Sequence, residues 1–363
     1  MCGIIAIVRR RAQRPVPDPA RVKELIGSIT ESIPKDLEEI SDLIESLSAL
    51  ERETSGVPGT IAFLDHPQLT TLLTDKCQNI ESALENFEIV LNDTHSALED
   101  IEAMNAAVVK VKDLVWSLQN DRVRSVNAVR ELCHGEINEG LVEVFTSIHE
   151  SLSALDRLEV RGRDSAGLHL MIRDHALDFD DPITASEIQE RSLDNDFKSG
   201  SVRIAGDQIS FVYKTASEIG QLGDNTLVLR EAIKSDELLR QALTGGMASA
   251  IVVGHTRWAS IGIISEPNAH PLNSEQQGLK ELPYVVAAIN GDVDNFADLK
   301  DLENLAIAPA VTSDSKVMPT LMAQHLIKTD KGDRSINQAF RKTVDSLEGS
   351  VAVVANAASD PDN

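Results

Sequence analysis

Cys2 is the residue best placed for chemistry, because it follows the initiator methionine and precedes Gly3. Removal of Met1 would leave a thiol and a free α-amino group on one residue. An α-amine has a pKa of about 7.7–8.0, so near neutral pH it can take the thiol proton and return it. The alternative is an ordinary core cysteine beside a strand, since cysteine is among the residue types most often buried. Met-Cys alone leaves both interpretations open.

Two arginine-containing segments could bind or position a substrate. Residues 161–167 read Arg-Gly-Arg-Asp-Ser-Ala-Gly, and residues 254–260 read Gly-His-Thr-Arg-Trp-Ala-Ser. The planar guanidinium of Arg257 offers a fork of donors that suits a substrate carboxylate. The alternatives are a capped helix-to-strand connection for the first segment and a surface loop with one structural ion pair for the second.

Asn290-Gly291 and Asp314 could stabilise charge during a reaction. Asn-Gly is most often the turn of a β-hairpin. Its other use is an oxyanion hole, in which a side-chain amide lies beside a backbone N–H that glycine leaves unobstructed. Asp314 stands in Thr-Ser-Asp-Ser before a helical pattern, where an aspartate is most often a helix cap. Each of these motifs is weak when taken alone.

The elements that must position these residues are a mixture of strands and helices. Continuous apolar runs predict buried strands at 3–8, 250–253 and 285–289, the last two each ending in a glycine-containing turn. Further strands are expected at 168–172, 209–213 and 350–355, and helices at 141–158, 218–243 (broken near Gly223), 321–327 and 336–347. The order shows no regular βαβ alternation and no Gly-x-Gly-x-x-Gly loop. We therefore predict an α+β fold rather than a nucleotide-binding doubly wound sheet.

Residues 15–135 differ from the rest of the chain. They carry 22 acidic and 10 basic side chains and four of the 20 glycines. Their apolar residues recur at helical spacing, which predicts three long helices, antiparallel if the connections are tight, with a break at 55–59. An acidic, solvated helical bundle or hairpin is one interpretation. A dimerising coiled coil is the other, although no long strict heptad is present.

Composition excludes several classes of function. The 363 residues carry a net charge of -24, which disfavours nucleic-acid binding through a broad basic face and binding to anionic membranes. No apolar stretch approaches the roughly 20 residues that span a bilayer. Three cysteines are too few for a disulfide scaffold and indicate a reducing cytoplasm. The nine histidines show no convincing metal-ligand spacing, so we expect no metal.

Taken together, the motifs resemble the glutaminase domain of glucosamine-6-phosphate synthase (glutamine–fructose-6-phosphate aminotransferase, isomerizing), a class II glutamine amidotransferase. That family opens Met-Cys-Gly-Ile and continues with Arg-Gly-Tyr-Asp-Ser-Ala-Gly, His-Thr-Arg-Trp-Ala-Thr, Asn-Ala-His-Pro, Asn-Gly and an aspartate before a helix. The matching segments follow in the same order at 1–4, 161–167, 255–260, 268–271, 290–291 and 314. The Arg257-Trp258 pair favours this branch over the similar phosphoribosylpyrophosphate amidotransferases, which usually carry a tyrosine at the second position.

The resemblance implies an N-terminal-nucleophile hydrolase fold, a four-layer αββα sandwich, here interrupted by an inserted α-helical bundle or hairpin. Residues 1–14 plus 136–363 would form the glutaminase domain, and 15–135 the insertion. Cys2 would be the nucleophile with its α-amine as the base, and Asn290 with Gly291 N–H the oxyanion hole. Arg257 would bind the glutamine α-carboxylate and Asp314 the α-ammonium, while Trp258 and Ser260 would line the loop that closes over glutamine.

The activity so implied is hydrolysis of L-glutamine to glutamate and ammonia, without cofactor or metal. The ammonia would supply a sugar-isomerase-type synthase domain or subunit that makes glucosamine 6-phosphate from fructose 6-phosphate. We expect that half to be absent from a chain that stops at Asn363, and the glutaminase domain to be short at its C-terminus. A homo-oligomer is compatible with the resemblance.

The sequence departs from the family pattern at several positions. Arg163 replaces a tyrosine, Ser260-Ile261 replaces Thr-His, and Ile289 stands where a histidine usually precedes the asparagine. The histidine that Ile261 replaces would add a polar contact to the loop that closes over glutamine, so its loss bears on substrate affinity more than on chemistry. Two other hypotheses stay open: a non-catalytic interaction protein that uses the acidic insertion on a glutaminase scaffold, and an amidotransferase that delivers ammonia to another acceptor.

Overall fold

The structure is a computed structural model that describes residues 2–32, 36–92, 98–135, 137–216, 221–279, 282–328 and 335–361. The chain divides into two compact units. One consists of Met1–Arg10 with Ser147–Asn363, and the other of Arg11–Thr146. The predicted domain boundaries at 14/15 and 135/136 stay a prediction.

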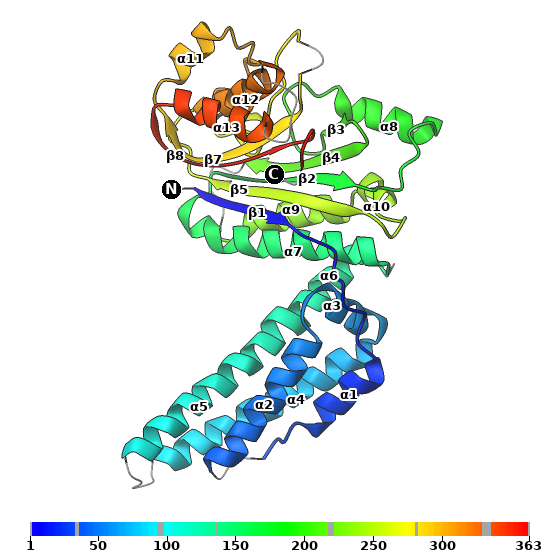
Figure 1. The fold of residues 1–363 in the computed structure, drawn as a ribbon, viewed down its shortest axis with the longest axis vertical. Coiled ribbons are helices and arrows are strands. Elements are labelled where there is room, and N and C mark those ends of the chain that lie inside the picture. The colour runs from blue at the N-terminus through cyan, green and yellow to red at the C-terminus, as the bar shows by residue number, and fades with distance from the viewer. Residues whose placement is uncertain are drawn as a thin grey trace. The chain divides into compact units, whose positions relative to one another are not determined.

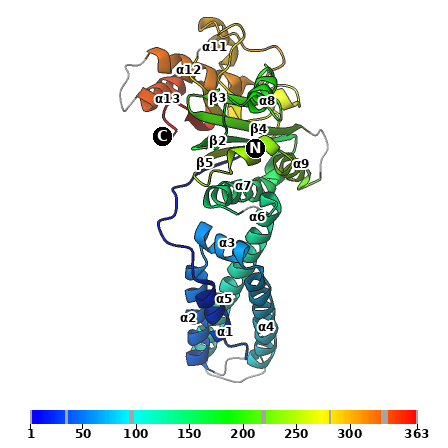
Figure 2. The same cartoon turned by 90° about the vertical axis from the view of Figure 1, so that its right-hand side faces the viewer.

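The second unit is helical (Figures 1 and 2). Helix α2 packs against α5, and α1 packs against both α2 and α4. Apolar side chains at helical spacing are buried between them, as at Ile40, Leu47, Val108 and Val111. Its elements are α1 (Pro19–Ser28), α2 (Leu37–Glu53), α3 (Gly56–Asp65), α4 (Pro67–Asn92), α5 (Leu98–Ser117), the π-helical η1 (Leu118–Arg124), α6 (Ser125–Cys133) and the start of α7 (Glu139–Leu158).

The prediction of three long helices with a break at 55–59 was wrong in detail. Helix α2 ends at Glu53, and α3 begins at Gly56, so most of the predicted break is helical. Pro58 is tolerated because it lies in the first turn of α3, where no intrahelical N–H is needed. Gly59 is required for packing, since a Cβ there would lie 1.8 Å from the carbonyl oxygen of Thr54.

The first unit contains two antiparallel sheets. The five-stranded sheet has the order β1 (Gly3–Val8), β5 (Ser249–Arg257), β2 (Ser165–Arg173), β4 (Gln208–Ala216) and β3 (Val202–Ala205). The three-stranded sheet has the order β6 (Leu272–Asn273), β7 (Val285–Val293) and β8 (Gly349–Ala357). Every strand pair is antiparallel, and strands and helices are mixed, which confirms the predicted α+β class.

Helices cover these sheets (Figure 1). Helix α9 packs on β2 and β4, α12 packs on β7, and β7 also contacts β1 and β5 of the larger sheet. The remaining elements are α8 (Pro182–Ser192), α9 (Asp224–Lys234), α10 (Glu237–Ala242), α11 (Phe296–Leu302), α12 (Val317–Lys328), α13 (Ser335–Ser346) and the short helices η2 (Glu159–Arg161), η3 (Glu266–Asn268) and η4 (Asp314–Lys316).

Two strand ends differ from the prediction. Gly254 lies inside β5 and Gly291 inside β7, so neither residue forms a turn. At Gly254 the reason is space, because a Cβ would lie 2.8 Å from Ile5 and 2.9 Å from Leu168. The predicted helix at 218–243 is two helices, α9 and α10, and its first residues lie outside the described residues. Among the described helices, none is long and apolar enough to cross a membrane.

Candidate functional site

The register of β1 on β5 places Cys2 at the end of the larger sheet. Gly3 pairs with Thr256, so Cys2 lies opposite Arg257, the last residue of β5, and contacts Trp258 in the loop that follows. The Gly3 N–H donates to Thr256 Oγ1 at 3.2 Å. A Cβ on Gly3 would lie 2.5 Å from that of Leu158, so only glycine lets β1 approach the end of α7 this closely.

Cys2 joins two of the predicted motifs. Its backbone N–H donates to Asn290 Oδ1 at 3.1 Å. Its Sγ accepts the Trp258 N–H at 3.3 Å and lies 3.7 Å from the Trp258 carbonyl oxygen. Burial raises the pKa of the Cys2 thiol, which stays protonated near neutral pH until a base removes the proton.

Asn290 and Gly291 lie within β7, where they pair with Ala352 and Val351 of β8. The Asn290 side-chain oxygen is occupied by Cys2 N–H, so its amide NH₂ is the group left to donate to a ligand. Gly291 has φ 131°, and a Cβ there would lie 1.9 Å from the Ser350 carbonyl oxygen. The close approach of β8 therefore requires this glycine whether or not its N–H binds an oxyanion.

Arg257 is almost fully buried at the end of β5, and its side chain holds the loop that follows. Its Nη1 donates to the Ile263 carbonyl oxygen at 3.2 Å, and Nη2 donates to that of Ile261. A guanidinium carries five N–H groups, so three stay available for a ligand. Burial lowers the pKa of Arg257 from its usual value, although an arginine keeps its charge at neutral pH.

Asp314 opens η4 and is also buried. Its Oδ2 accepts the Val293 N–H at 2.7 Å, which joins η4 to the end of β7. Within the described chain no lysine or arginine forms an ion pair with it. Burial raises the pKa of its carboxyl group, and the nearby charge of Arg257 offsets this only in part.

Trp258 and Ser260 lie in the loop after β5. The Trp258 side chain is 60% exposed, so only its backbone takes part in the Cys2 contacts. Ser260 Oγ donates to Asp292 Oδ1 and thereby ties this loop to β7. The structure thus brings Cys2, Asn290 and the Trp258 backbone together, whereas the Ser260 side chain bonds to a carboxylate that the sequence did not single out.

His255 and His270 lie beneath the site. They are fully buried and stacked with ring centroids 4.3 Å apart. His255 Nε2 bonds to the Ile289 carbonyl oxygen at 2.9 Å, and His270 Nδ1 accepts the Ile289 N–H at 3.3 Å. Burial lowers the pKa of His255 to about 3, so the ring is neutral at physiological pH. These contacts hold the middle of β7 in place.

Sequence reasoning missed three polar residues that organise the site. Asp164 Oδ2 accepts the Ala259 N–H at 2.7 Å and holds the loop after β5. Asn268 is fully buried, and its Oδ1 accepts the N–H groups of Thr312 and Ser313 at 2.7 and 2.8 Å. Asp292 accepts from Ser260. Asp164 and Asn268 lie inside motifs quoted above, so the sequence could have indicated them. Asp292 lies in none of these motifs, and no sequence pattern pointed to it.

No family model matches this chain. Its sequence is similar to the glutamine–fructose-6-phosphate aminotransferase [isomerizing] of Thermococcus kodakarensis, with 32% identity over 151 residues, 41% of this chain and 23% of that protein. The enzyme of the same name from Sulfurisphaera tokodaii is 31% identical over 139 residues, 38% of this chain and 22% of that protein. That of Synechocystis sp. is 26% identical over 217 residues, 59% of this chain and 26% of that protein.

The chain thus spans about a quarter of the length of these relatives. Their names bear out the predicted similarity to enzymes of the glutamine–fructose-6-phosphate aminotransferase type. A solved structure of glutamine phosphoribosylpyrophosphate amidotransferase from B. subtilis, complexed with ADP and GMP, has a TM-score of 0.28 and 17% identity, over 53% of this chain and 35% of that one. A score at this level does not establish a common fold.

Proposed function

We propose that the site around Cys2 hydrolyses L-glutamine to glutamate and ammonia. The observation that carries this proposal is the pair of contacts at Cys2, whose N–H lies 3.1 Å from Asn290 Oδ1 and whose Sγ lies 3.3 Å from Trp258 N. Cys2, which can combine nucleophile and base, therefore contacts two residues that lie more than 250 positions away in the sequence. The similarity to glutamine-dependent aminotransferases supports glutamine as the substrate.

The proposed chemistry needs Met1 to be removed, so that Cys2 carries an α-amine. The amine takes the thiol proton, and Sγ attacks the side-chain carboxamide carbon. The Asn290 amide NH₂ and the Gly291 N–H would donate to the oxyanion. The C–N bond then breaks, ammonia leaves with the returned proton, and water hydrolyses the glutamyl thioester to glutamate.

Two buried charges would select the amino acid end of glutamine. Arg257 keeps three N–H donors for the α-carboxylate, and Asp314 offers a carboxylate without an ion-pair partner in the described chain for the α-ammonium. Binding the substrate would then pair each buried charge with a substrate group of opposite sign, which offsets the cost of burying these charges. Trp258 and Ser260, on the loop after β5, would close over the bound glutamine.

The proposal also includes the type of sandwich fold, the helical insertion and the partner that would use the ammonia. The two sheets with helices on β2, β4 and β7 are compatible with the αββα sandwich of the N-terminal-nucleophile hydrolases, with a helical insertion at about 15–135. A sugar-isomerase-type synthase domain or subunit would consume the ammonia, as the relatives' names suggest. The absence of a disulfide among Cys2, Cys77 and Cys133 is compatible with a reducing cytoplasm, and a homo-oligomer stays compatible with the proposal.

The test is glutamate release from glutamine by full-length protein whose N-terminus has been defined by intact mass. Cys2→Ala is expected to abolish release without changing the melting temperature. Cys133→Ala is the matched control, because Cys133 is a buried cysteine of helix α6 outside the site and its replacement should leave release unchanged. Undiminished release by the Cys2 variant would overturn the proposal.

A further inference from the structure

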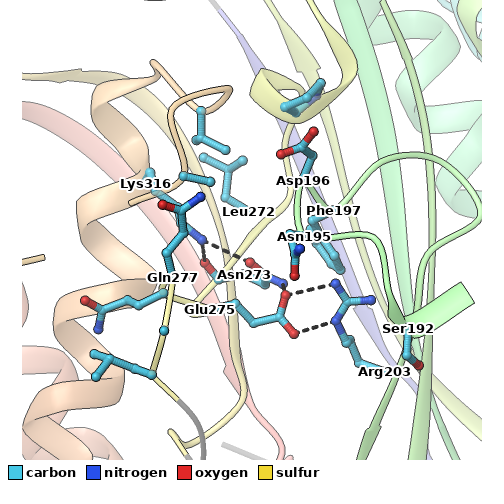
Figure 3. Close-up of a pocket in the computed structure, with 16 residues that line it drawn as sticks. Ser192, Asn195, Asp196, Phe197, Arg203, Leu272, Asn273, Glu275, Gln277 and Lys316 are labelled. Atoms are coloured by element: carbon cyan, nitrogen blue, oxygen red, sulfur yellow. Dashed lines mark hydrogen bonds and ion pairs between the residues drawn. The ribbon is translucent and has the colours of Figure 1, made fainter. Parts of the chain in front are cut away.

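A cavity of about 430 Å³ lies in the first unit, and none of the residues assigned above to glutamine lines it. Figure 3 shows Lys316, Asn273 and Glu275 on one wall, facing Asn195, Phe197 and Arg203. Leu272 and Val311 add apolar surface. The cavity is large enough for a small organic molecule.

Lys316 is the unusual residue of this cavity. It is only 4% exposed, and its Nζ donates to the backbone oxygen of Asn273 at 2.6 Å and to Asn273 Oδ1 at 3.0 Å (Figure 3). Both acceptors are neutral, and no carboxylate of the described residues forms an ion pair with Lys316. Burial lowers the pKa of Lys316 to about 8, so the ammonium form still predominates at neutral pH. Its third N–H is left for another acceptor.

Gln276 adds a second unfilled donor. Its side chain is 6% exposed, and its Oε1 accepts the Ala306 N–H at 2.9 Å. Its Nε2 is buried and has no hydrogen-bond partner in the described part of the chain. A buried donor without an acceptor is unfavourable, and a ligand oxygen would offset that cost.

The other charges of the cavity are already paired. Glu275 accepts from Arg203 Nε and Nη2, and also from Asn273 Nδ2 at 2.8 Å. Behind Phe197, the fully buried Lys214 places Nζ 4.7 Å from the ring centroid and has no hydrogen-bond partner among the described residues. The hydrogen-bonding groups that the cavity leaves unpaired are therefore the donors of Lys316 and Gln276, with the positive charge of Lys316.

We propose that this cavity binds a small carboxylate with an apolar body. One carboxylate oxygen would accept from Lys316 Nζ and the other from Gln276 Nε2, while the apolar part packs on Phe197 and Leu272. One ammonium and one amide match the single charge and two oxygens of a carboxylate, whereas a phosphate dianion would need more donors. This site does not depend on glutamine hydrolysis.

The probe is benzoate, compared with its neutral isostere benzamide, in saturation-transfer NMR titrations of the full-length protein. Wild type is expected to bind benzoate at least about tenfold more tightly than benzamide, as a charge-assisted hydrogen bond of about 1.5–3 kcal/mol implies. Lys316→Met and Gln276→Leu should each weaken benzoate binding at least fivefold. Thermal melts establish whether each variant is folded. If Lys316→Met does not fold, Gln276→Leu still tests the proposal.

Arg257→Ala separates the cavity from the glutamine site, which could itself take a carboxylate. Benzoate affinity should be unchanged in this variant and in Lys198→Met, which removes an exposed lysine whose Nζ bonds to Asp196, a residue that lines the cavity. Equal binding of benzoate and benzamide would overturn the proposal. So would loss of binding on Arg257→Ala, tighter binding of inorganic phosphate, or folded Lys316 and Gln276 variants with wild-type affinity.

Discussion

The Cys2 thiol needs a base to remove its proton, and the groups around Cys2 indicate which base can do so. Burial raises the pKa of the thiol, and the buried His255 has a pKa lowered to about 3. His255 also uses Nε2 to bond the Ile289 carbonyl oxygen. A histidine base of the cysteine-protease type is therefore a poor fit, and the α-amine of a processed Cys2 is the better one.

This choice predicts the pH dependence of glutamine hydrolysis. The base must be unprotonated, so kcat/KM should rise with pH, with a midpoint at about pH 7.7–8.0, and level off roughly one pH unit above it. The measurement is kcat/KM from pH 5.5 to 9 on protein shown by mass to lack Met1. A limb with a midpoint near pH 6 to 6.5 would instead indicate a histidine or carboxylate base.

Asp314→Asn is expected to stabilise the fold and to weaken substrate binding. Folding raises the pKa of this carboxyl, so its ionised form lowers stability as pH rises above the unfolded value of about 3.9. The variant should melt at a higher temperature than wild type at pH 7, and the difference should vanish near pH 3.5. KM for glutamine should rise at least tenfold, because the substrate ammonium loses its counter-charge.

The control for this prediction is Asp298→Asn, at an exposed position in the first turn of α11. It should change neither KM nor the free energy of unfolding by more than about 0.5 kcal/mol. A variant of Asp314 with unchanged KM would show that this carboxylate is a structural cap and does not bind the substrate.

At the residue scale, the sequence singles out Cys2, Arg257 and Asn290 as candidate site residues because their motifs are local, and their roles stay a prediction. It did not find that Ser260 bonds Asp292, because that contact depends on how the loop after β5 meets β7. The hairpin interpretation of Asn290-Gly291 failed for the same reason. Only the pairing with β8 shows that these residues continue a strand.

Among the elements, the strands were predicted well because their apolar runs are continuous. Strand β1 has the predicted bounds, and β5, β7 and β8 each include the predicted segment and extend beyond it. Their ends were predicted less well, since Gly254 and Gly291 are needed for close approach of neighbours and not for turns. In the helical unit, the Gly-Val-Pro-Gly sequence looked like a break because proline at the start of a helix cannot be distinguished from a proline in a loop by pattern alone.

Gly291→Ala is expected to disrupt the contact of β7 with β8. The new Cβ would lie 1.9 Å from the Ser350 carbonyl oxygen at a φ of 131°, which should lower the free energy of unfolding by at least about 2 kcal/mol. Gly27→Ala is the matched control. Gly27 lies in α1 with no atom within 4 Å of an added Cβ, so alanine should stabilise by about 0.5–1 kcal/mol. Denaturant melts measure both, and a neutral Gly291→Ala would contradict the assigned register.

For the whole molecule, each of the two units buries its own set of apolar side chains. Val285, Ile289 and Met318 belong to one core, whereas Ile40 and Val111 are buried in the helical unit. Scanning calorimetry should therefore resolve two transitions. Gly291→Ala should shift only one of them and Gly27→Ala only the other. A single transition that both substitutions move would show that the units unfold together.

The most direct test of the central claim is peptide mass spectrometry of protein quenched in acid during turnover of glutamine. The account predicts a glutamyl thioester on Cys2 in the N-terminal peptide that lacks Met1, and no adduct on Cys77 or Cys133. Glutamate release by protein that retains Met1, or an adduct on another residue, would contradict it.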